Sequence, residues 1–230
     1  MSAVAIIPAR GGSKRIPRKN IKLFNGRPII AYSIESALQS QCFDRVIVST
    51  DDSEIADIAK QFGAEVPFVR PAHIANDYAT TLEVIHHAIS TLVVIDSDIT
   101  EVCCIYATAP FVTPSQLLAG KQVLKQKDAD YLFPVAAYPA PIQRALRLDT
   151  NGFVSMMELE HLNSRSQDLN EGFYDTGQYY WGKASAYLSN TPIYSEKSLG
   201  LVVPKNSCVD IDDMQDWALA EFLYNYRQQQ

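Results

Sequence analysis

Residues Ala3 to Asn20, with the sequence AVAIIPARGGSKRIPRKN, form the stretch that decides the fold. The first part, Ala3 to Pro8, is a short continuous apolar run, which predicts a strand buried on both faces of a parallel sheet. Gly11 and Gly12 follow this strand, and glycines allow the backbone to turn its N–H groups toward an anion. Because ligands of open α/β sheets bind beyond the carboxyl ends of the strands, this is a predicted phosphate-binding loop.

The charge of the loop favours an anionic ligand. The chain has 230 residues and a net charge of −6, yet the segment from Ala9 to Ser33 holds seven basic residues and no acidic one. This concentration predicts a small polyphosphate ligand, and a solvated loop without ligand is the alternative. Nucleic acid is not expected, since neither a basic domain nor a reading element is visible. Neither the Walker A pattern nor G-x-G-x-x-G is present.

Apolar runs and amphipathic segments alternate along the rest of the chain. Strands are predicted at 3–8, 45–49, 66–69, 102–106, 131–136, 177–181 and 199–203, and helices at 28–39, 53–62, 80–92, 114–125 and 213–226. The alternation predicts an α/β fold with a doubly wound, mostly parallel sheet, in a single domain that spans residues 1–230. The alternation lapses at about 137–174, which predicts an excursion suited to a lid or a subunit contact.

The composition excludes several classes of protein. With 47% hydrophobic and 20% charged residues, the chain is not disordered. The longest apolar stretch, around Leu92 to Ile95, is too short to span a membrane, and the N-terminus lacks the pattern of a secretory signal. We therefore expect a soluble, cytoplasmic protein that makes no membrane contact. Its four cysteines are expected to be reduced and buried.

Two aspartates precede the predicted terminal helix. Asp210 and Asp212 flank Ile211, and residues i and i+2 of an extended segment share a face. Two carboxylates this close are unfavourable without a compensating cation, and oxygen ligands suit a Mg²⁺ ion that bridges nucleotide phosphates. The pair is therefore a predicted magnesium site. The alternative is that Asp212 or Asp213 only caps the helix.

The run from Ile6 to Ile21, IIPARGGSKRIPRKNI, resembles the signature of the cytidylyltransferases that activate nine-carbon acidic sugars, the CMP-sialic acid synthetase family. Further segments resemble the same family: they are the sequence STDD at Ser49 to Asp52, Arg70-Pro-Ala with Asp77, and the D-x-D of Asp210 to Asp212 with Asp216 and Trp217. The resemblance implies a Rossmann-like nucleotide-diphospho-sugar transferase fold, CTP as a substrate, and a homodimer.

Individual roles follow from the loop and the resemblance together. The residues expected to bind the nucleotide are Arg10, Gly11, Gly12, Ser13, Lys14, Lys19, Asn20, Arg70 and Asp77. The catalytic residues are expected to be Arg10 and Lys19, which would stabilise the reacting phosphorus, and Asp212 as a ligand of Mg²⁺. Asp51 and Asp52 could instead cap the next helix, and Arg70 could form a surface ion pair.

Three segments in or directly after the excursion bear on the sugar. Pro139 to Leu146, Asn163 to Leu169 and Tyr174 to Gly182 resemble the pseudaminic acid subgroup of the family, and Tyr106 stands where sialic acid synthetases have a sugar-contacting Gln. A sugar carboxylate is bound by Arg, Lys or amide donors. The expected sugar-binding residues are Tyr106, Gln143, Arg144, Arg165 and Gln178. The four donors among them could instead serve the dimer contact that the resemblance implies.

The expected reaction is attack of the anomeric hydroxyl of pseudaminic acid on the α-phosphorus of CTP, with release of pyrophosphate. Three alternatives remain open. In the first, the substrate is sialic, legionaminic or 3-deoxy-octulosonic acid. In the second, the chain is a CTP-binding regulator without catalytic activity. An RNA-binding module that uses the basic loop is the third, and it predicts steeply salt-dependent binding to oligonucleotides.

Overall fold

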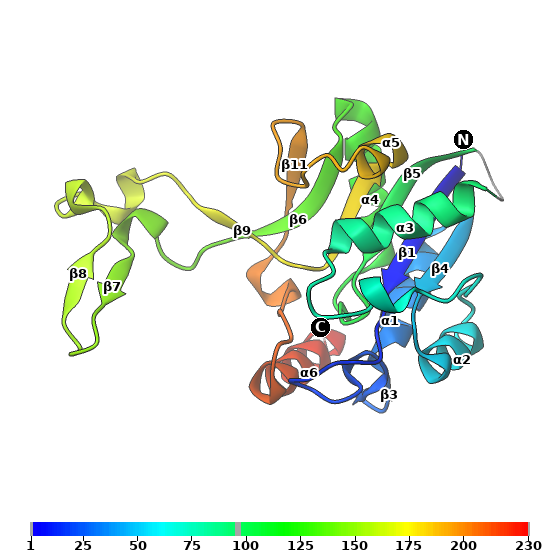
Figure 1. Cartoon of the computed structure of the whole chain (residues 1–230). Helices are drawn as coiled ribbons and strands as arrows, with labels where there is room; N and C mark the ends of the chain where they lie inside the picture. The colour runs from blue at the N-terminus through cyan, green and yellow to red at the C-terminus, as the bar shows by residue number, and fades with distance from the viewer. Residues whose placement is uncertain (1, 95–97, 230) are drawn as a thin grey trace.

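The computed structural model of the chain describes residues 2–94 and 98–229 (Figure 1). The strands are β1 (Ser2–Pro8), β2 (Leu23–Phe24), β3 (Arg27–Pro28), β4 (Arg45–Ser49), β5 (Ile99–Ile105), β6 (Tyr131–Ala137), β7 (Leu146–Leu148), β8 (Val154–Met156), β9 (Phe173–Asp175), β10 (Tyr179–Lys183) and β11 (Ser198–Val202). The α-helices are α1 (Ile29–Ser40), α2 (Ser53–Gln61), α3 (Thr81–Val93), α4 (Pro114–Lys127), α5 (Ala184–Leu188) and α6 (Met214–Gln228). The short 3-10 helices include η1 (Lys19–Ile21) and η2 (Ala72–Ile74).

The central sheet has the strand order β11-β6-β10-β5-β1-β4, with β9 paired to β6 outside this path. Strand β1 is parallel to both of its neighbours, β4 and β5, and β11 is parallel to β6. Strand β10 is antiparallel to β5 and β6, and β9 is antiparallel to β6. The prediction of a doubly wound, mostly parallel sheet is confirmed, because helices cover both faces and these two strands alone run the other way within the described sheet.

Alternation along the strands divides the core between two faces. Ala5 and Ile7 of β1 pack with apolar residues of α1, α2 and α4, whereas Val4 and Ile6 pack with those of α3 and α5. Successive side chains of a strand point to opposite faces, so a strand inside a doubly wound sheet must be apolar throughout. The adjacent Cys103 and Cys104 follow this rule and lie on opposite faces. All four cysteines are free and buried.

The predicted strand at 66–69 is wrong. On the side of β4 away from β1, parallel pairing is limited to an isolated bridge between Ile47 and Glu65. Pro67 lacks an N–H group and cannot continue a hydrogen-bonded ladder, and the Val69 side chain is 75% exposed. The other predicted strands and helices are present with ends shifted by up to three residues, while the short helix α5 was not predicted.

Between β6 and β9 the chain leaves the sheet and projects away from it (Figure 1). We call this segment, residues 138–172, the arm. It contains the hairpin of β7 and β8 and three 3-10 helices. Large apolar side chains of the arm face solvent within the single chain: Leu146, Leu148, Phe153, Val154, Met157, Leu159 and Leu162 are each 58–75% exposed. The rest of the described chain does not cover these side chains.

Helix α6 packs against the predicted phosphate loop and against the segment that directly precedes the helix. Ile16 of the loop, Ile211 between the two aspartates, and Trp217 of α6 are all at most 3% exposed and belong to one apolar cluster. The ring of Phe24 packs edge-on against Trp217, with 5.6 Å between ring centroids. Burial of these side chains therefore places Asp210 and Asp212 beside the basic loop.

None of the helices within 2–94 and 98–229 combines the length and the apolarity that a membrane crossing requires.

Candidate functional site

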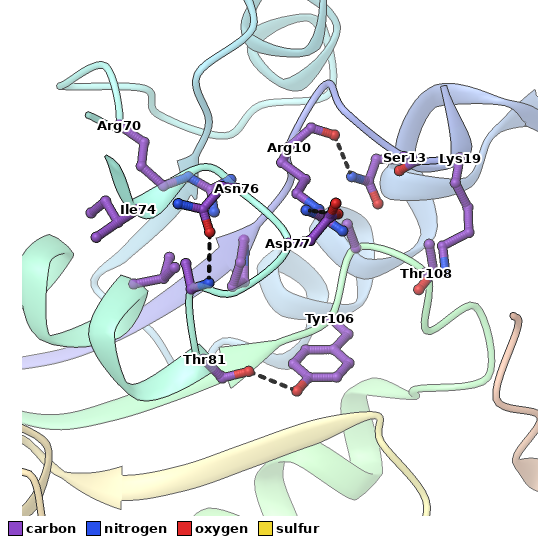
Figure 2. A pocket seen from close by; sticks show the side chains of 15 residues that line it. Arg10, Ser13, Lys19, Arg70, Ile74, Asn76, Asp77, Thr81, Tyr106 and Thr108 are labelled. Carbon is purple, nitrogen blue, oxygen red and sulfur yellow. Dashed lines mark hydrogen bonds and ion pairs between the residues drawn. The ribbon is translucent and has the colours of Figure 1, made fainter. Parts of the chain in front are cut away.

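A pocket of about 310 Å³ opens at the carboxyl ends of β1, β4 and β5 (Figure 2). This is the edge of the sheet where open α/β folds bind ligands. Among the residues that line it are Arg10, Ser13, Lys19, Asn20, Arg70, Asn76, Asp77, Thr81, Tyr106 and Thr108. Six of the nine predicted nucleotide-binding residues thus meet in one pocket. Lys14 does not line the pocket but forms an ion pair with Asp77, which does. The other two, Gly11 and Gly12, belong to the loop beside the pocket.

The glycine-containing part of the loop is fixed by the end of β4. The N–H group of Gly11 donates to Asp51 Oδ1 at 3.2 Å, and a Cβ atom on Gly11 would lie 2.5 Å from Asp52 Oδ2. Gly11 is therefore required by close approach, whereas a Cβ atom on Gly12 would meet open space. Asp52 caps α2 by accepting from the Ile55 N–H group at 3.0 Å, so the capping alternative holds for this residue.

Asp52 also accepts hydrogen bonds from Arg18, a residue in the left-handed backbone region with φ 55°. The Arg18 guanidinium and the Ile55 N–H group stabilise the carboxylate and lower the pKa of Asp52 to about 2. Asp52 is thus an anion across the whole physiological range of pH. It holds both the loop and the start of α2 in position.

Two cations of the loop surround a carboxylate in the pocket. Arg10 Nη1 lies 2.6 Å from Asp77 Oδ1, and Lys14 Nζ lies 2.5 Å from Asp77 Oδ2. Hydrogen bonds from Lys14 and Arg10 lower the pKa of Asp77. Asn20 Nδ2 donates to the Arg10 carbonyl at 2.9 Å, which steadies the backbone from which Arg10 projects. The space between these cations suits an oxyanion, and in this structure a carboxylate fills it.

Lys19 connects the pocket to the acidic segment. Its Nζ donates to the Ile211 carbonyl at 2.6 Å. Burial lowers the pKa of Lys19, although the negative charges of Asp212 and Asp210 oppose the shift. A desolvated ammonium group at the pocket wall interacts more strongly with a phosphate than a hydrated one would.

Asp210 and Asp212 do not cap α6. Asp213 takes that place, since its side chain accepts from the N–H groups of Gln215 and Asp216, and the Asp216 carboxylate accepts from Asp213 in return. The capping alternative therefore holds for Asp213 and is wrong for Asp212. Asp212 Oδ2 pairs with Arg15 Nη1 at 2.7 Å.

The electrostatics of this pair fit a divalent cation. Loss of solvent and the neighbouring Asp212 charge raise the pKa of Asp210. Burial is the larger of these two causes, and the nearby cations Lys19 and Arg15 oppose the shift. The donor set of carboxylate oxygens is the one that Mg²⁺ prefers. The residues present therefore fit a magnesium ion.

The Arg70 guanidinium lies at the opposite end of the pocket (Figure 2). Its side chain is buried, with the residue 4% exposed, so the surface ion-pair alternative is wrong. Nη2 donates to the Ser49 carbonyl at 3.0 Å, and Nε has no hydrogen-bond partner among the described residues. Burial lowers the pKa of Arg70. A buried donor without a partner at a pocket wall is available for an acceptor on a ligand.

Tyr106 forms another part of the wall, where its hydroxyl lies 2.9 Å from Thr81 Oγ1 (Figure 2). Burial raises the pKa of Tyr106 to about 12, so the phenol stays protonated. Thr81, Asn76 and Thr108 were not predicted from the sequence. Asn76 lies one residue before Asp77 and Thr108 two residues after Tyr106, so proximity to predicted residues was the available signal.

The other predicted sugar-binding residues lie outside this pocket within the described chain. Gln178 is buried and donates from Nε2 to the Ser207 carbonyl at 2.6 Å, while its Oε1 has no partner among the described residues. The remaining three are on the arm. Gln143 bonds the Asn170 carbonyl, Arg144 bonds Ser166, and Arg165 pairs with Asp168 at 2.7 Å. A single chain does not bring these three to Tyr106.

The fold and the pocket are those of a nucleotidyltransferase, and residues 4–201 match a family model described as cytidylyltransferase. The chain belongs to the cytidylyltransferase family. Over 97% of both chains it is 43% identical to a pseudaminic acid cytidylyltransferase of Campylobacter jejuni. It is 34% identical to a CMP-N,N'-diacetyllegionaminic acid synthase of Legionella pneumophila, over 100% of this chain and 99% of that one.

A solved structure with the same fold is a CMP:2-keto-3-deoxy-manno-octonic acid synthetase complexed with CTP. It superposes with a TM-score of 0.69 at 17% identity and covers 100% of both chains. At this level of identity the likeness shows the fold alone.

Proposed function

We propose that the protein couples CTP to pseudaminic acid and releases pyrophosphate, in the cytoplasm where CTP is available. The observation that carries the proposal is the pocket in which Arg10, Lys19 and Arg70 meet at the carboxyl edge of the sheet. The 43% identity to a pseudaminic acid cytidylyltransferase over 97% of both chains supports the choice of sugar.

The chemistry follows from the position of these cations. The anomeric hydroxyl oxygen forms a bond to the α-phosphorus, the bond between that phosphorus and the pyrophosphate oxygen breaks, and the hydroxyl proton is lost. Arg10 and Lys19 stabilise the negative charge that accumulates on the phosphoryl oxygens. Arg70 donates to an acceptor at the other end of the nucleotide. Catalysis is thus by positioning and charge stabilisation, without a covalent enzyme intermediate.

We propose that Mg²⁺ assists the reaction and that Asp210 and Asp212 hold it. When bound, the ion neutralises phosphate charge and acidifies the attacking hydroxyl. The protein's contribution is the geometry of the acidic segment, which Ile211 and Trp217 fix against the loop. Lys19 Nζ bonds the carbonyl of Ile211 and therefore stands next to both aspartates.

We propose that the arm forms a homodimer and that each arm completes the pocket of the other chain. The exposed apolar residues of the arm require a partner surface. Gln143, Arg144 and Arg165 provide the donors that a sugar carboxylate needs, yet they belong to the arm, which projects away from the sheet (Figure 1), and none of them lines the pocket of Tyr106. A second copy is the partner that brings these donors to the pocket in a closed, symmetric assembly.

Mixing two inactive variants tests this arrangement. Lys19→Ala inactivates the pocket, and Arg165→Ala removes a sugar donor from the arm. In a refolded 1:1 mixture, half of the dimers contain one intact site, so we expect about a quarter of the wild-type turnover.

Arg147→Ala is the matched control, because Arg147 is an exposed arginine of the same arm. It should remain active without mixing. Failure of the mixture to exceed either single variant would show that the arm does not act on the other chain's pocket. Light scattering gives the oligomeric state in parallel.

Pyrophosphate release with CTP and Mg²⁺ tests the reaction itself, with pseudaminic acid, N-acetylneuraminic acid and diacetyllegionaminic acid compared side by side. We expect release with pseudaminic acid at the highest kcat/KM. Preference for another acid would keep the chemistry and overturn the sugar. Binding of CTP with no release from any of the three would favour a regulator without catalytic activity.

A further inference from the structure

Asp175 lies at the end of β9, the strand by which the chain returns from the arm to the sheet. Its Oδ2 atom accepts from the hydroxyls of Tyr180 at 2.7 Å and Tyr194 at 2.8 Å. Its Oδ1 atom accepts from the Gly177 N–H group at 2.8 Å. Hydrogen bonds to a carboxylate are among the strong ones, so three of them hold this side chain in one orientation.

Both tyrosines that contact Asp175 remain hydrogen-bond donors. Burial raises the pKa of Tyr180 well above its usual range and raises the pKa of Tyr194 to about 12, so both phenols stay protonated. The two side chains differ in their surroundings. Tyr180 is 6% exposed, whereas Tyr194 is 71% exposed.

The turn after Asp175 holds the backbone of Tyr106. Gly177 forms this turn with φ 61°, a left-handed conformation that glycine adopts without strain. Directly after it, the Gln178 carbonyl accepts from the Tyr106 N–H group at 2.9 Å. The Tyr106 carbonyl in turn accepts from the Ser33 hydroxyl at 2.8 Å. The backbone of Tyr106 is therefore held from two sides.

The ring of Tyr106 is oriented by the same segment of chain. It packs against the Tyr180 ring with 5.6 Å between centroids, and its hydroxyl lies 2.9 Å from Thr81 Oγ1 (Figure 2). The Tyr180 ring also packs against Phe133, with 5.7 Å between centroids. Because the Tyr180 hydroxyl donates to Asp175, the far end of that ring is fixed as well, and the fixed ring limits the rotation of Tyr106.

We propose that Asp175 and Tyr180 are positioning residues that determine specificity for the acidic sugar through Tyr106, which rests on the proposed coupling of CTP to pseudaminic acid. Tyr106 lines the nucleotide pocket, while no residue of the segment 174–182 does. This segment therefore acts on the pocket by supporting its wall. Since it follows the arm directly, it also links the position of the arm to the shape of the wall.

Loss of this support is expected to affect the sugar and to spare the nucleotide. A misplacement of about 1 Å at a distance from the reacting atoms can lower a rate by about 100-fold. We therefore expect kcat/KM for pseudaminic acid to fall by about 10- to 100-fold in Tyr180→Phe and in Asp175→Ala. The affinity for CTP should change little, because Arg10 and Arg70 lie on other segments of the pocket.

Tyr194→Phe is the matched control. It removes a hydroxyl donor from the same oxygen of Asp175, but the interactions described for Tyr194 do not include Tyr106. It should keep near-normal kcat/KM for pseudaminic acid. Rates are compared with N-acetylneuraminic acid as second substrate, since loss of specificity should narrow the ratio of the two kcat/KM values in Tyr180→Phe. Calorimetric CTP binding and thermal melting of each variant are the readouts for a purely structural role.

A measurement without sugar separates this proposal from the proposed function. In nuclear magnetic resonance spectra of protein with ¹³C-labelled tyrosine, Tyr106→Phe identifies the Tyr106 signal. That signal should shift or broaden in Asp175→Ala and stay in place in Tyr194→Phe. If the wild type turns over no acidic sugar while the signal still moves in Asp175→Ala, the proposed function and the specificity role are overturned, and the positioning of Tyr106 by Asp175 stands.

Three results would overturn the proposal itself. The first is an unmoved Tyr106 signal in Asp175→Ala, and the second is an equal effect of Tyr180→Phe and Tyr194→Phe on the rates. The third is a loss of CTP affinity and of melting temperature in parallel with activity, which would show that these residues serve only the fold. Should Asp175→Ala fail to fold, Tyr180→Phe takes its place in the spectra, because it removes a single oxygen atom and retains the ring.

Discussion

Replacement of Lys19 by alanine is expected to lower kcat by about 100- to 1,000-fold, the range found when one preorganised donor is removed from a transition state. Lys19 Nζ lies at the wall of the nucleotide pocket, held by the Ile211 carbonyl at 2.6 Å. Its charge is needed most when the phosphoryl group carries the most negative charge, so kcat should fall more than CTP affinity. Initial rates of pyrophosphate release and calorimetric CTP binding separate the two effects.

Lys22→Ala is the matched control for this variant. Lys22 belongs to the same basic loop, but its ammonium lies over the Trp217 ring, 5.6 Å from the centroid, and not in the pocket. It should keep near-normal kcat. Equal rates for the two variants would contradict the role of Lys19, since overall loop charge would then be the factor that matters.

Removal of the Asp212 carboxylate is expected to reduce turnover by about 100-fold or more, because the magnesium ion that we propose it holds would contribute several kcal/mol of transition-state stabilisation. The fold should survive Asp212→Asn. The partner of the side chain, Arg15, is 67% exposed and Asp212 itself 45%, and such exposed pairs contribute about 1 kcal/mol or less. The Asp212 N–H group still donates to Asp216 in the variant.

Three measurements distinguish a metal ligand from an ion-pair partner at Asp212. A titration of activity with Mg²⁺ should shift to higher concentration in Asp212→Asn. Arg15→Ala, which removes the same ion pair from the other side, should retain most of the activity. Asp57 is an exposed carboxylate on α2, and the variant Asp57→Asn should have the same activity as the wild type. Near-normal turnover in Asp212→Asn would rule out the metal assignment.

Local patterns were sufficient to predict the parts of the fold that short stretches of chain determine. The apolar run of β1 and the amphipathic pattern of α3 act within a few residues, so these elements were predicted from the sequence. The segment 66–69 is apolar enough for a strand, but Pro67 and the course of the chain toward Arg70 prevent pairing. Short-range hydrophobicity carries no information about this tertiary competition.

The candidate site was predictable where its residues belong to a recognisable motif, as in the loop and in the segments that hold Arg70, Asp77 and Tyr106. Residues of the loop from Arg10 to Asn20 were found together, because glycines and cations cluster there. Thr81 was missed because its role depends on the Tyr106 hydroxyl, 25 residues away along the chain. The position of Arg165 on a projecting arm follows from the path of the chain between β6 and β9, which composition does not reveal.

The apolar cluster of Ile16, Ile211 and Trp217 also sets the order in which the protein matures during synthesis. The bond between Lys19 Nζ and the Ile211 carbonyl joins residues 192 positions apart. Helix α6 leaves the ribosome after every strand of the sheet, and domains fold as their segments emerge. A nascent chain can therefore form the glycine loop early, yet Asp210 and Asp212 meet that loop only when α6 docks. An incomplete chain therefore lacks the contact between Lys19 and the segment that carries Asp210 and Asp212.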